Sequence, residues 1–161
     1  MIADVAIRLA VAADAAGIAS MSRDLIEYGL RWGWRDERVA QAISAPETNV
    51  AVAGQEGNPF AFGIMNYRDD DAHLVLFAVQ PKMQRQGIGS ALLMWLEEVA
   101  RAAGAQRIRV EARRESVAAR SFYNEHGYHE RVLKTAMYGN RVDGVRLEKW
   151  LCSRGPLRCE T

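Results

Sequence analysis

The first 45 residues carry a hydrophobic pattern that predicts a short edge strand followed by two helices. The strand is expected at Ala6 to Leu9. Asp14 can cap the first helix, because its carboxylate can accept hydrogen bonds from the free N–H groups of a first turn. The apolar stripe of that helix recurs at helical spacing, at Ile18, Met21, Leu25 and Tyr28. The RWGWR segment around Gly33 ends it, and Asp36 to Ile43 is predicted to form a second helix that stops before Pro46.

Three strand-like runs follow the second helix. Asn49 to Ala53 and Phe60 to Tyr67 are separated by a turn of Gly, Asn and Pro at 57–59, which favours a β-hairpin. The third run, HLVLFAV from His73 to Val79, is nearly all apolar and is therefore expected to be a central strand buried on both faces. The Asp69 to Asp71 run before it is interpreted as a solvated turn, in preference to a metal site.

Helices and strands alternate in the second half. The longest helix is expected to end at Gly104 as its C-cap, because apolar residues recur at helical spacing at Ile88, Leu92, Leu96, Val99 and Ala103. Arg107 to Glu111 alternates, with Ile108 and Val110 inward, and is predicted to be a strand. A helix connects it to the His73 strand, so the two strands are expected to be parallel.

A last helix and two strands complete the pattern. Ser116 is expected to cap the helix and Gly127 to end it, with one side formed by Ala119, Phe122, Tyr123 and His126. Tyr128 to Leu133 and Val145 to Trp150 are predicted strands joined by YGNRVDG. The order βααβββαβαββ indicates an α/β (α+β) fold with a mixed, mostly antiparallel sheet of six to seven strands and helices on both faces.

Composition narrows the class of protein. The chain has 161 residues, of which 49% are apolar and 25% charged, as in an ordinary globular protein. We expect a single domain over residues 1–151 and a loose tail over residues 152–161. No run is apolar enough to span a membrane and no basic segment precedes the N-terminal apolar run, which predicts a cytoplasmic location. Cys152 and Cys159 both lie in the tail, so neither a disulfide framework nor a metal motif is expected.

Charge is divided unevenly along the chain. Residues 1–100 hold 8 Lys and Arg against 13 Asp and Glu, a balance of −5, and residues 101–161 hold 13 against 7, a balance of +6. A basic half can attract an anionic ligand, but the chain contains no dense basic run with interleaved aromatic residues. The pattern therefore favours a small anionic ligand over a nucleic acid.

The stretch QRQGIGS, Gln84 to Ser90, is the strongest local signal in the chain. It places two glycines between a buried strand and a helix. Glycine lets the backbone approach a ligand and adopt positive φ, and the N–H groups of a helix N-terminus attract anions. A pyrophosphate is the anion that such a loop suits. The spacing fits neither the GxGxxG pattern of a dinucleotide fold nor GxxxxGK[ST], so both nucleotide motifs are excluded.

The pattern QxxGxG at Gln84 to Gly89 resembles the pyrophosphate loop of the GNAT superfamily of acyl-CoA N-acyltransferases. VQP at Val79 to Pro81 precedes it, and RSFYNEHGY at Arg120 to Tyr128 resembles the family's AxxFYxxxGF segment, which would start at Ala119. The order of elements matches from about Ala6 to Leu151. One departure is Ser116, where the family often has Asn. The resemblance implies the GNAT fold.

The same resemblance implies how acetyl-CoA would bind. The cofactor is expected between the splayed ends of the His73 and Arg107 strands, without a metal. Phe77 and Val79 would supply backbone contacts to the pantetheine arm, and an N–H near Val79 would stabilise the oxyanion. The loop contacts to the phosphates are expected from Gln84, Arg85, Gln86, Gly87, Ile88, Gly89 and Ser90, with further contacts from Ser116 and Arg120.

Three residues are candidates for acid and base chemistry. Tyr123 matches the family's proton donor for the thiolate that leaves, although a tyrosine beside Phe122 on a helical stripe can equally be part of the core. An attacking amine must be neutral, so a base is needed. Glu111 and His73 are the candidates. The alternative for Glu111 is a salt bridge to Arg113 or Arg114, and the alternative for His73 is a position in a turn without a catalytic role.

The acceptor side of the site is implied by the family to lie at the first two helices and the last hairpin. Here these segments carry Trp32, Trp34 and Tyr138. The two tryptophans can wall a pocket for an apolar or cationic amine, or can cap the core. The balanced charges of these helices predict no particular substrate charge.

The resemblance implies an acetyl-CoA-dependent N-acetyltransferase that moves acetyl to a primary amine of a small molecule or peptide in a ternary complex. Two alternatives stay open: a non-catalytic acyl-CoA-binding sensor, and a generic nucleotide-binding protein. The acyl group can be acetyl or longer. No nucleic acid or membrane partner is expected, and the last strand is a candidate edge for homodimer pairing.

Overall fold

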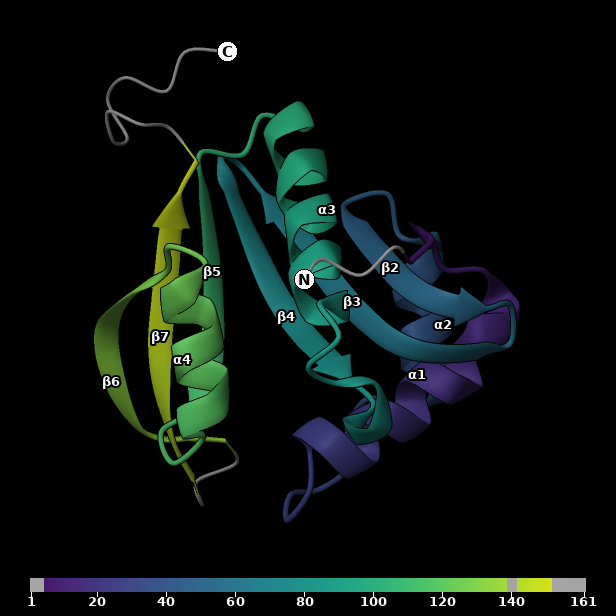
Figure 1. Ribbon diagram of the computed structural model, residues 1–161, viewed down its shortest axis with the longest axis horizontal. Helices are drawn as coiled ribbons and strands as arrows, with labels where there is room; N and C mark the ends of the chain where they lie inside the picture. The colour runs from purple at the N-terminus through teal and green to yellow at the C-terminus, as the bar shows by residue number, and fades with distance from the viewer. Residues whose placement is uncertain (1–4, 139–141, 152–161) are drawn as a thin grey trace. The chain divides into compact units, whose positions relative to one another are not determined.

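The computed structural model describes residues 5–138 and 142–151, and for residues 132–138, 142 and 143 it describes the backbone alone. The order of elements is the predicted βααβββαβαββ (Figure 1). The helices are α1 (Ala15–Met21), α2 (Asp36–Ser44), α3 (Ile88–Ala102) and α4 (Val117–Glu125), with short turns η1 (Ala12–Asp14), η2 (Ser22–Ile26) and η3 (Pro81–Met83). The strands are β1 (Ile7–Leu9), β2 (Thr48–Gln55), β3 (Asn58–Arg68), β4 (Asp71–Val79), β5 (Arg107–Arg113), β6 (His129–Tyr138) and β7 (Val142–Trp150).

The seven strands form one mixed sheet in the order β1-β2-β3-β4-β5-β7-β6. β4 and β5 are parallel, as the helix between them predicts. The pairs β1–β2, β2–β3, β5–β7 and β6–β7 are antiparallel. The mostly antiparallel α/β sheet is therefore confirmed. The prediction that the last strand is an edge was wrong, because β7 inserts between β5 and β6 and buries Val145 and Leu147.

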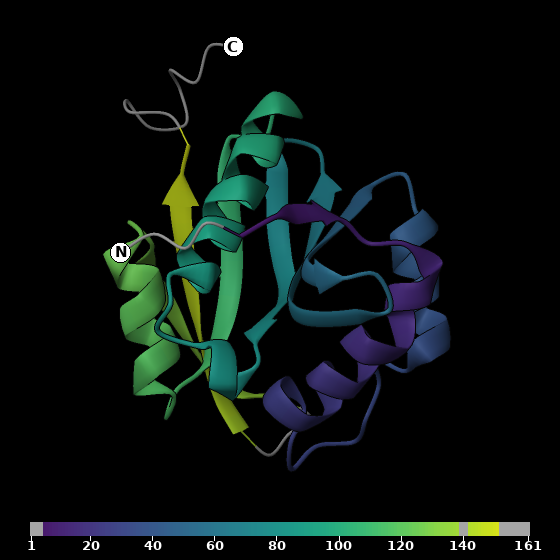
Figure 2. The same ribbon diagram turned by 45° about the vertical axis from the view of Figure 1, so that its right-hand side comes forward.

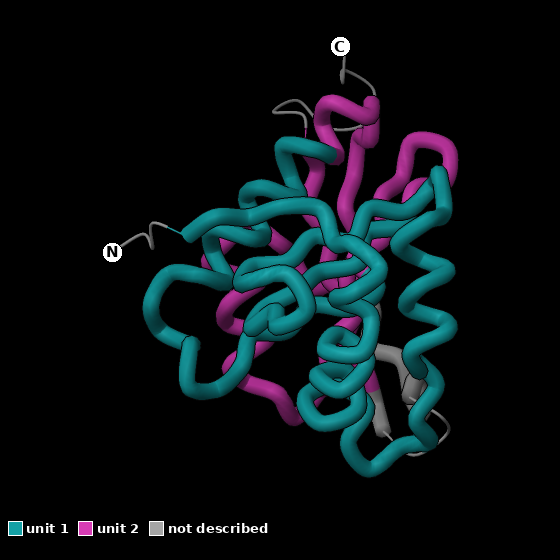
Figure 3. Tube along the Cα trace, turned by 90° about the vertical axis from the view of Figure 1, so that its right-hand side faces the viewer, with its two compact units in different colours: residues 1–66, 75–99 teal, residues 67–74, 100–161 magenta. Residues whose placement is uncertain are grey.

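The chain divides into two compact units, which Figure 3 shows in different colours. Unit 1 comprises Met1–Asn66 and Val75–Val99, and unit 2 comprises Tyr67–Leu74 and Ala100–Thr161. β4 belongs to both, with its first half in unit 2 and its second half in unit 1. Each unit is described by itself.

The core of unit 1 is formed by α1 and α2 against β2, β3 and the second half of β4. Its largest members are Ile18, Met21, Val39, Val50, Val52, Phe62, Ile64 and Leu76. Of the predicted helical stripe, Ile18 and Met21 are buried and Leu25 is half-buried against the core, but α1 itself ends at Met21 and the chain widens into a π-helical turn at Ser22–Ile26. Tyr28 consequently lies outside the core and is 49% exposed.

Asp14 holds the start of unit 1 together in a way that differs from the predicted helix cap. Its side chain makes no capping hydrogen bond to α1. Instead, the fully buried carboxylate accepts hydrogen bonds from Arg8 at 2.7 and 3.0 Å and from the N–H groups of Val11 at 2.8 Å and Gly57 at 2.9 Å. Because a buried carboxylate needs partners, these contacts tie β1 and the β2–β3 turn to the helix.

β4 is not buried equally on both faces, as its apolar sequence had predicted. Ala72, Leu74, Leu76 and Ala78 are buried, whereas the residues between them are only half-buried. One face of β4 therefore belongs to the core, and the other, which carries His73 and Phe77, is partly accessible.

In unit 2, α4 lies along β5, β7 and β6, as Figure 1 and the turned view of Figure 2 both show. The buried residues of this unit include Ile108, Val110, Tyr123, Tyr128 and Leu147. Ser116 occupies the N-cap position of α4 but makes no side-chain cap hydrogen bond, so that expectation was wrong. Its backbone, with φ −82° and ψ 82°, lacks the extended conformation that normally directs a capping hydroxyl to the helix N–H groups. Gly127 ends the helix with φ 89°, as predicted.

Candidate functional site

The loop after β4 is closed by hydrogen bonds within unit 1. The N–H of Gln80 donates to the carbonyl of Phe60 at 2.8 Å, and Pro81–Met83 form a 3-10 turn. The side-chain amide of Gln84 then donates to the carbonyl of Val79 at 2.9 Å. Gln84 thus holds the loop against the end of β4.

Two residues of the loop have left-handed backbone conformations. Gly87 has φ 82° and Arg85 has φ 63°. For Arg85 this costs about 1–2 kcal/mol, and such strain in a non-glycine residue is often found where a ligand binds. α3 begins directly afterwards at Ile88, and the first N–H groups of a helix have no partner within it. The loop therefore fits an anionic ligand.

The remaining loop residues differ in what they present. Gly89 lies in the first turn of α3 and does not have a positive φ, so of the two glycines only Gly87 uses the left-handed region. The side chains of Gln84, Arg85 and Gln86 are exposed, whereas Ile88 is buried. Ile88 consequently anchors the start of α3 in the core, whereas the side chains of the preceding loop are exposed to solvent.

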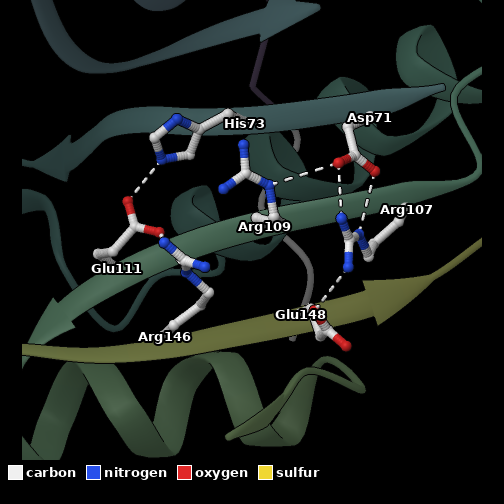
Figure 4. A network of polar contacts seen from close by, with 7 residues as sticks. All are labelled: Asp71, His73, Arg107, Arg109, Glu111, Arg146 and Glu148. Carbon is white, nitrogen blue, oxygen red and sulfur yellow. Dashed lines mark hydrogen bonds and ion pairs between the residues drawn. The ribbon is translucent and has the colours of Figure 1, made fainter. Parts of the chain in front are cut away.

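A network of charged side chains covers one face of β4, β5 and β7 in unit 2 (Figure 4). His73 Nε2 and Glu111 Oε1 lie 2.5 Å apart, and Arg146 Nε lies 3.4 Å from Glu111 Oε2. The two candidate bases are therefore hydrogen-bonded to each other. The alternative salt bridge of Glu111 to Arg113 or Arg114 is not what the structure has, since the ion pair of Arg113 is with Glu115 at 3.9 Å.

Strand register explains why these residues meet. His73 is opposite Arg109 in the β4–β5 pair, and Glu111 is opposite Arg146 in the β5–β7 pair. Because alternate residues of a strand share a face, polar residues at every second position form one surface. Sequence reasoning missed Asp71, Arg107, Arg109, Arg146 and Glu148 as members of this network. The alternation of RIRVEAR and VRLEK was the signal that could have found them.

Both central carboxylates of the network are held ionised. Burial raises the pKa of Glu111, but the hydrogen bond and charge of His73 and the charges of Arg146 and Arg109 outweigh it, so the pKa lies below its usual value. Hydrogen bonds from Arg107 at 3.0 and 2.6 Å lower the pKa of Asp71. A carboxylate that stays charged can stabilise positive charge on a neighbouring imidazole or amine.

Tyr123 lies on the inner side of α4 and is 5% exposed. Its ring meets Phe122 edge-on with centroids 5.3 Å apart and Tyr128 with centroids 5.6 Å apart. The ring is thus part of the aromatic core of unit 2. A core position for the ring is compatible with a reactive hydroxyl at its tip.

Arg120 is already engaged within unit 2. Its guanidinium donates to both oxygens of Glu130 at 2.8 and 2.9 Å and to the carbonyl of Arg114 at 2.8 Å. A contact from Arg120 to a CoA phosphate would have to share the guanidinium with Glu130.

The RWGWR segment packs against the core of unit 1. Trp32 and Trp34 are half-buried there, with the Arg35 guanidinium 4.5 Å from the centroid of Trp32 and the Arg38 guanidinium 3.9 Å from that of Trp34. The carboxylate of Glu27 accepts hydrogen bonds from the N–H groups of Gly33 and Trp34 and fixes the segment. The aromatic faces thus carry cations of the chain itself. The side chain of Tyr138 lies outside the described part of the structure.

Across residues 5–138 and 142–151, no group of three or more His, Cys, Asp or Glu residues could hold a metal ion. No helix within the same ranges is long and apolar enough to cross a membrane. Cys152 and Cys159 lie outside the described residues.

Solved structures share this fold. The ribosomal-protein-S18-alanine N-acetyltransferase of Escherichia coli superposes with a TM-score of 0.76 at 23% identity, over 97% of this chain and 99% of that one. The PaiA N-acetyltransferase of Thermoplasma acidophilum, in complex with coenzyme A, gives a TM-score of 0.76 at 17% identity, over 92% of this chain and 99% of that one.

Sequence comparison identifies the family. The [ribosomal protein bS18]-alanine N-acetyltransferase of Escherichia coli K12 is 34% identical over 84 residues, which is 52% of this chain and 57% of that relative. The chain thus matches little more than half the length of that protein. The model of the acetyltransferase (GNAT) family matches residues 18–128, which include the glycine loop and Tyr123. This chain therefore belongs to the acetyltransferase (GNAT) family.

Proposed function

We propose that this protein is an acetyl-CoA-dependent N-acetyltransferase that moves the acetyl group directly to a primary amine in a ternary complex. The observation that carries the proposal is the left-handed backbone at Arg85 and Gly87 immediately before α3, within a family match that spans residues 18–128. A relative acts on the alanine amine of a ribosomal protein, as its name states.

The loop has the features that a CoA pyrophosphate requires. The first N–H groups of α3 and the N–H groups of the loop would donate to the phosphate oxygens, with the charge of Arg85 nearby. Gln84, Gln86, Gly89 and Ser90 complete this part of the proposed site, and Ser116 and Arg120 are further proposed contacts. The pantetheine arm would follow β4 beyond Leu74, where Phe77 and Val79 offer backbone groups. The N–H near Val79 is the proposed oxyanion donor.

Tyr123 is the proposed acid. Attack of the amine on the thioester carbonyl breaks the carbon–sulfur bond, and the sulfur leaves with the electron pair. A free thiol has a pKa near 8.5 and a phenol near 10, so a phenol placed within hydrogen-bonding distance can deliver the proton that the thiolate needs. The phenolate then recovers its proton from solvent or from the acceptor.

His73 and Glu111 act in this proposal as one base. Because Glu111 is ionised, the Nε2 that faces it carries the hydrogen and donates to the carboxylate. The other ring nitrogen, Nδ1, then has a free lone pair that can take a proton from the attacking ammonium group. Glu111 stabilises the imidazolium that results, which is the role of the carboxylate partner in other histidine bases.

Trp32, Trp34 and Tyr138 are proposed to line the acceptor side.

Steady-state kinetics test the proposed direct transfer. Varying acetyl-CoA at several fixed amine concentrations should give intersecting double-reciprocal lines, as direct transfer in a ternary complex requires, with the N-acetylated amine detected by mass spectrometry. Parallel lines would instead indicate an acetyl-enzyme intermediate and overturn direct transfer. Saturable CoA binding without any acetylated product would support the acyl-CoA-binding sensor.

A further inference from the structure

The charged face of unit 2 holds more guanidinium groups than carboxylates. Among the described side chains that form its ion pairs, Asp71, Glu111 and Glu148 face Arg107, Arg109, Arg131 and Arg146. Three negative groups therefore meet four positive ones, in addition to His73. The network lacks one anion, so one guanidinium must be poorly compensated.

Two guanidinium groups of the network, those of Arg109 and Arg146, have a buried Nε without a hydrogen-bond partner among the described residues. Arg146 Nε still lies 3.4 Å from Glu111 Oε2, so Arg109 is the less compensated of the two. Both oxygens of Asp71 accept hydrogen bonds from Arg107, and Glu148 pairs with Arg107 and Arg131 at 3.2 Å each. The ion pair of Arg109 is a 3.7 Å contact to Asp71, which is too long for a hydrogen bond. In the described part of the chain, its buried Nε has no hydrogen-bond partner. A buried donor without an acceptor is costly, and a ligand that supplies the acceptor removes that cost.

An unused acceptor lies close to this unused donor. Glu111 Oε2 is also buried and has no hydrogen-bond partner among the described residues, since its contact with Arg146 is a misaligned 3.4 Å ion pair. Arg109 and Glu111 are two residues apart on the same face of β5, and His73 is opposite Arg109 in the register. The Nε of Arg109 is buried, but the side chain as a whole keeps 25% of its surface exposed, so a ligand can reach the exposed part of the side chain. Figure 4 shows its guanidinium between His73 and Asp71.

We propose that Arg109 binds a carboxylate of the acceptor, so that the acceptor is an amine with a carboxylate near its amino group, as in a free amino acid. This inference rests on the proposed function for the amine, which would lie at Glu111 and His73. The planar fork of a guanidinium binds a carboxylate through two parallel hydrogen bonds, and Arg109 has donors available for both. The positive charge of Arg109 and the negative charge of Glu111 together complement a zwitterion.

A peptide N-terminus lacks this carboxylate. Its amine is followed by an amide, whose neutral carbonyl would leave Arg109 without an anion. A hydrogen bond between charged groups contributes enough that the acid form should be preferred by about 10- to 100-fold. Acceptors that differ only in this group therefore distinguish a free amino acid from a peptide end.

The test compares free amino acids with their carboxamides in acetyl transfer. The wild-type protein should acetylate the acid at least about tenfold more efficiently, measured as kcat/KM. Arg109→Met, which keeps the length of the side chain without its charge, should reduce the preference to near one. Arg131→Met is the matched control in the same network, since it is half exposed and pairs with Glu148, and should keep the preference. A wild-type protein that favours the carboxamide or an N-terminal peptide, or a preference that survives Arg109→Met, overturns the inference.

A binding measurement separates this inference from the proposed function. Titration of the wild-type protein with N-acetylalanine, which carries the carboxylate and no free amine, should shift the side-chain Nε–Hε NMR signal of Arg109, and N-acetylalaninamide should not. The signal is assigned with Arg109→Lys, which retains the charge. If no amine is acetylated but this shift occurs, the transferase proposal fails and the carboxylate site stands. If N-acetylalanine leaves the signal unchanged, the carboxylate site is wrong even where acetyl transfer is seen.

Discussion

His73 Nε2 and Glu111 Oε1 lie 2.5 Å apart, although the residues are separated by 38 positions in the chain. The parallel pairing of β4 with β5 brings them together, and the adjacent β7 adds Arg146 beside the same carboxylate. An imidazole, a carboxylate and a guanidinium thus share one half-buried face. The proposed base is this histidine beside a carboxylate whose pKa lies below its usual value.

Glu111→Gln tests that partnership, because it keeps the shape of the side chain and removes its charge. We expect kcat/KM at pH 7 to fall by about 10²-fold, the lower end of what a general base contributes. The defect should shrink as pH rises toward 10, since the amine then loses its proton without help. The measurement is a pH profile of kcat/KM for the variant and the wild type. The control is Glu115→Gln, whose side chain is 61% exposed and which should behave as the wild type. A defect of constant size across this pH range would contradict the role of Glu111 in proton removal.

Asp14 should make the stability of the protein depend on acid pH. Burial raises its pKa, but the hydrogen bonds from Arg8, Val11 and Gly57 lower the pKa by more, so that it falls from 3.8 to about 2. A lowered carboxylate pKa stabilises the fold above the unfolded value and loses that contribution as pH falls through the folded value. The difference corresponds to about 2 kcal/mol, of which roughly half is lost by pH 3.

Urea unfolding of Asp14→Asn and the wild type at pH 7 and pH 3 measures this contribution. The variant should be less stable at pH 7 by about 2 kcal/mol or more, and the gap should narrow at pH 3. Asp24→Asn is the control, since its pair with Arg23 is exposed and should contribute little to stability. A gap between Asp14→Asn and the wild type that does not change with pH would show that the carboxylate charge is not what stabilises this region.

Gly87→Ala should weaken CoA binding. The φ of 82° strains any residue with a Cβ by about 1–2 kcal/mol, and relief of that strain would move the loop N–H groups away from the phosphates. Gly104→Ala is the matched control, because Gly104 has φ 90° and an added Cβ meets nothing within 4 Å. Both variants should lose similar stability. Calorimetric titration with CoA should show a dissociation constant raised at least about tenfold in Gly87→Ala and unchanged in Gly104→Ala. Equal affinities of the two variants for CoA would show that the loop does not bind CoA.

Tyr123→Phe should separate turnover from binding. The variant keeps the ring that packs on Phe122 and Tyr128 and removes only the hydroxyl. We expect kcat to fall by about 10²-fold while the dissociation constant for acetyl-CoA stays within about twofold. Tyr128→Phe removes a hydroxyl from the same aromatic cluster and should leave kcat near the wild-type value. Full turnover in Tyr123→Phe would return Tyr123 to a purely structural role.

Much of the fold could be predicted from periodicity alone. The helical stripe from Ile88 to Leu96 corresponds to α3, and the alternation at Ile108 and Val110 corresponds to β5. The rule for helical crossovers also predicted correctly that β5 is parallel to β4. The errors concern features that local pattern does not determine. The place of β7 inside the sheet depends on which strand of the last hairpin, β6 or β7, pairs with β5, and both strands present the same backbone groups.

The candidate site was predictable only where its residues are contiguous in sequence. The loop from Gln84 to Ser90 is such a segment, and its position before a helix can be read directly. The contact between His73 and Glu111, and the uncompensated charge of Arg109, arise from strand register. A shift of one residue would turn every one of these side chains to the other face, so the network could not be derived before the register was known.

Acetyl transfer itself is measured as acetyl-CoA-dependent release of free thiol, near pH 8, across a panel of amines. The panel includes free amino acids, their carboxamides and peptides with N-terminal or lysine amines. We expect release above the no-acceptor background with at least one class of amine, and most efficiently with free amino acids. No release with any amine, from protein that binds CoA and is folded, would contradict acetyl transfer from acetyl-CoA and leave an acyl-CoA-binding protein or a donor with a longer acyl group.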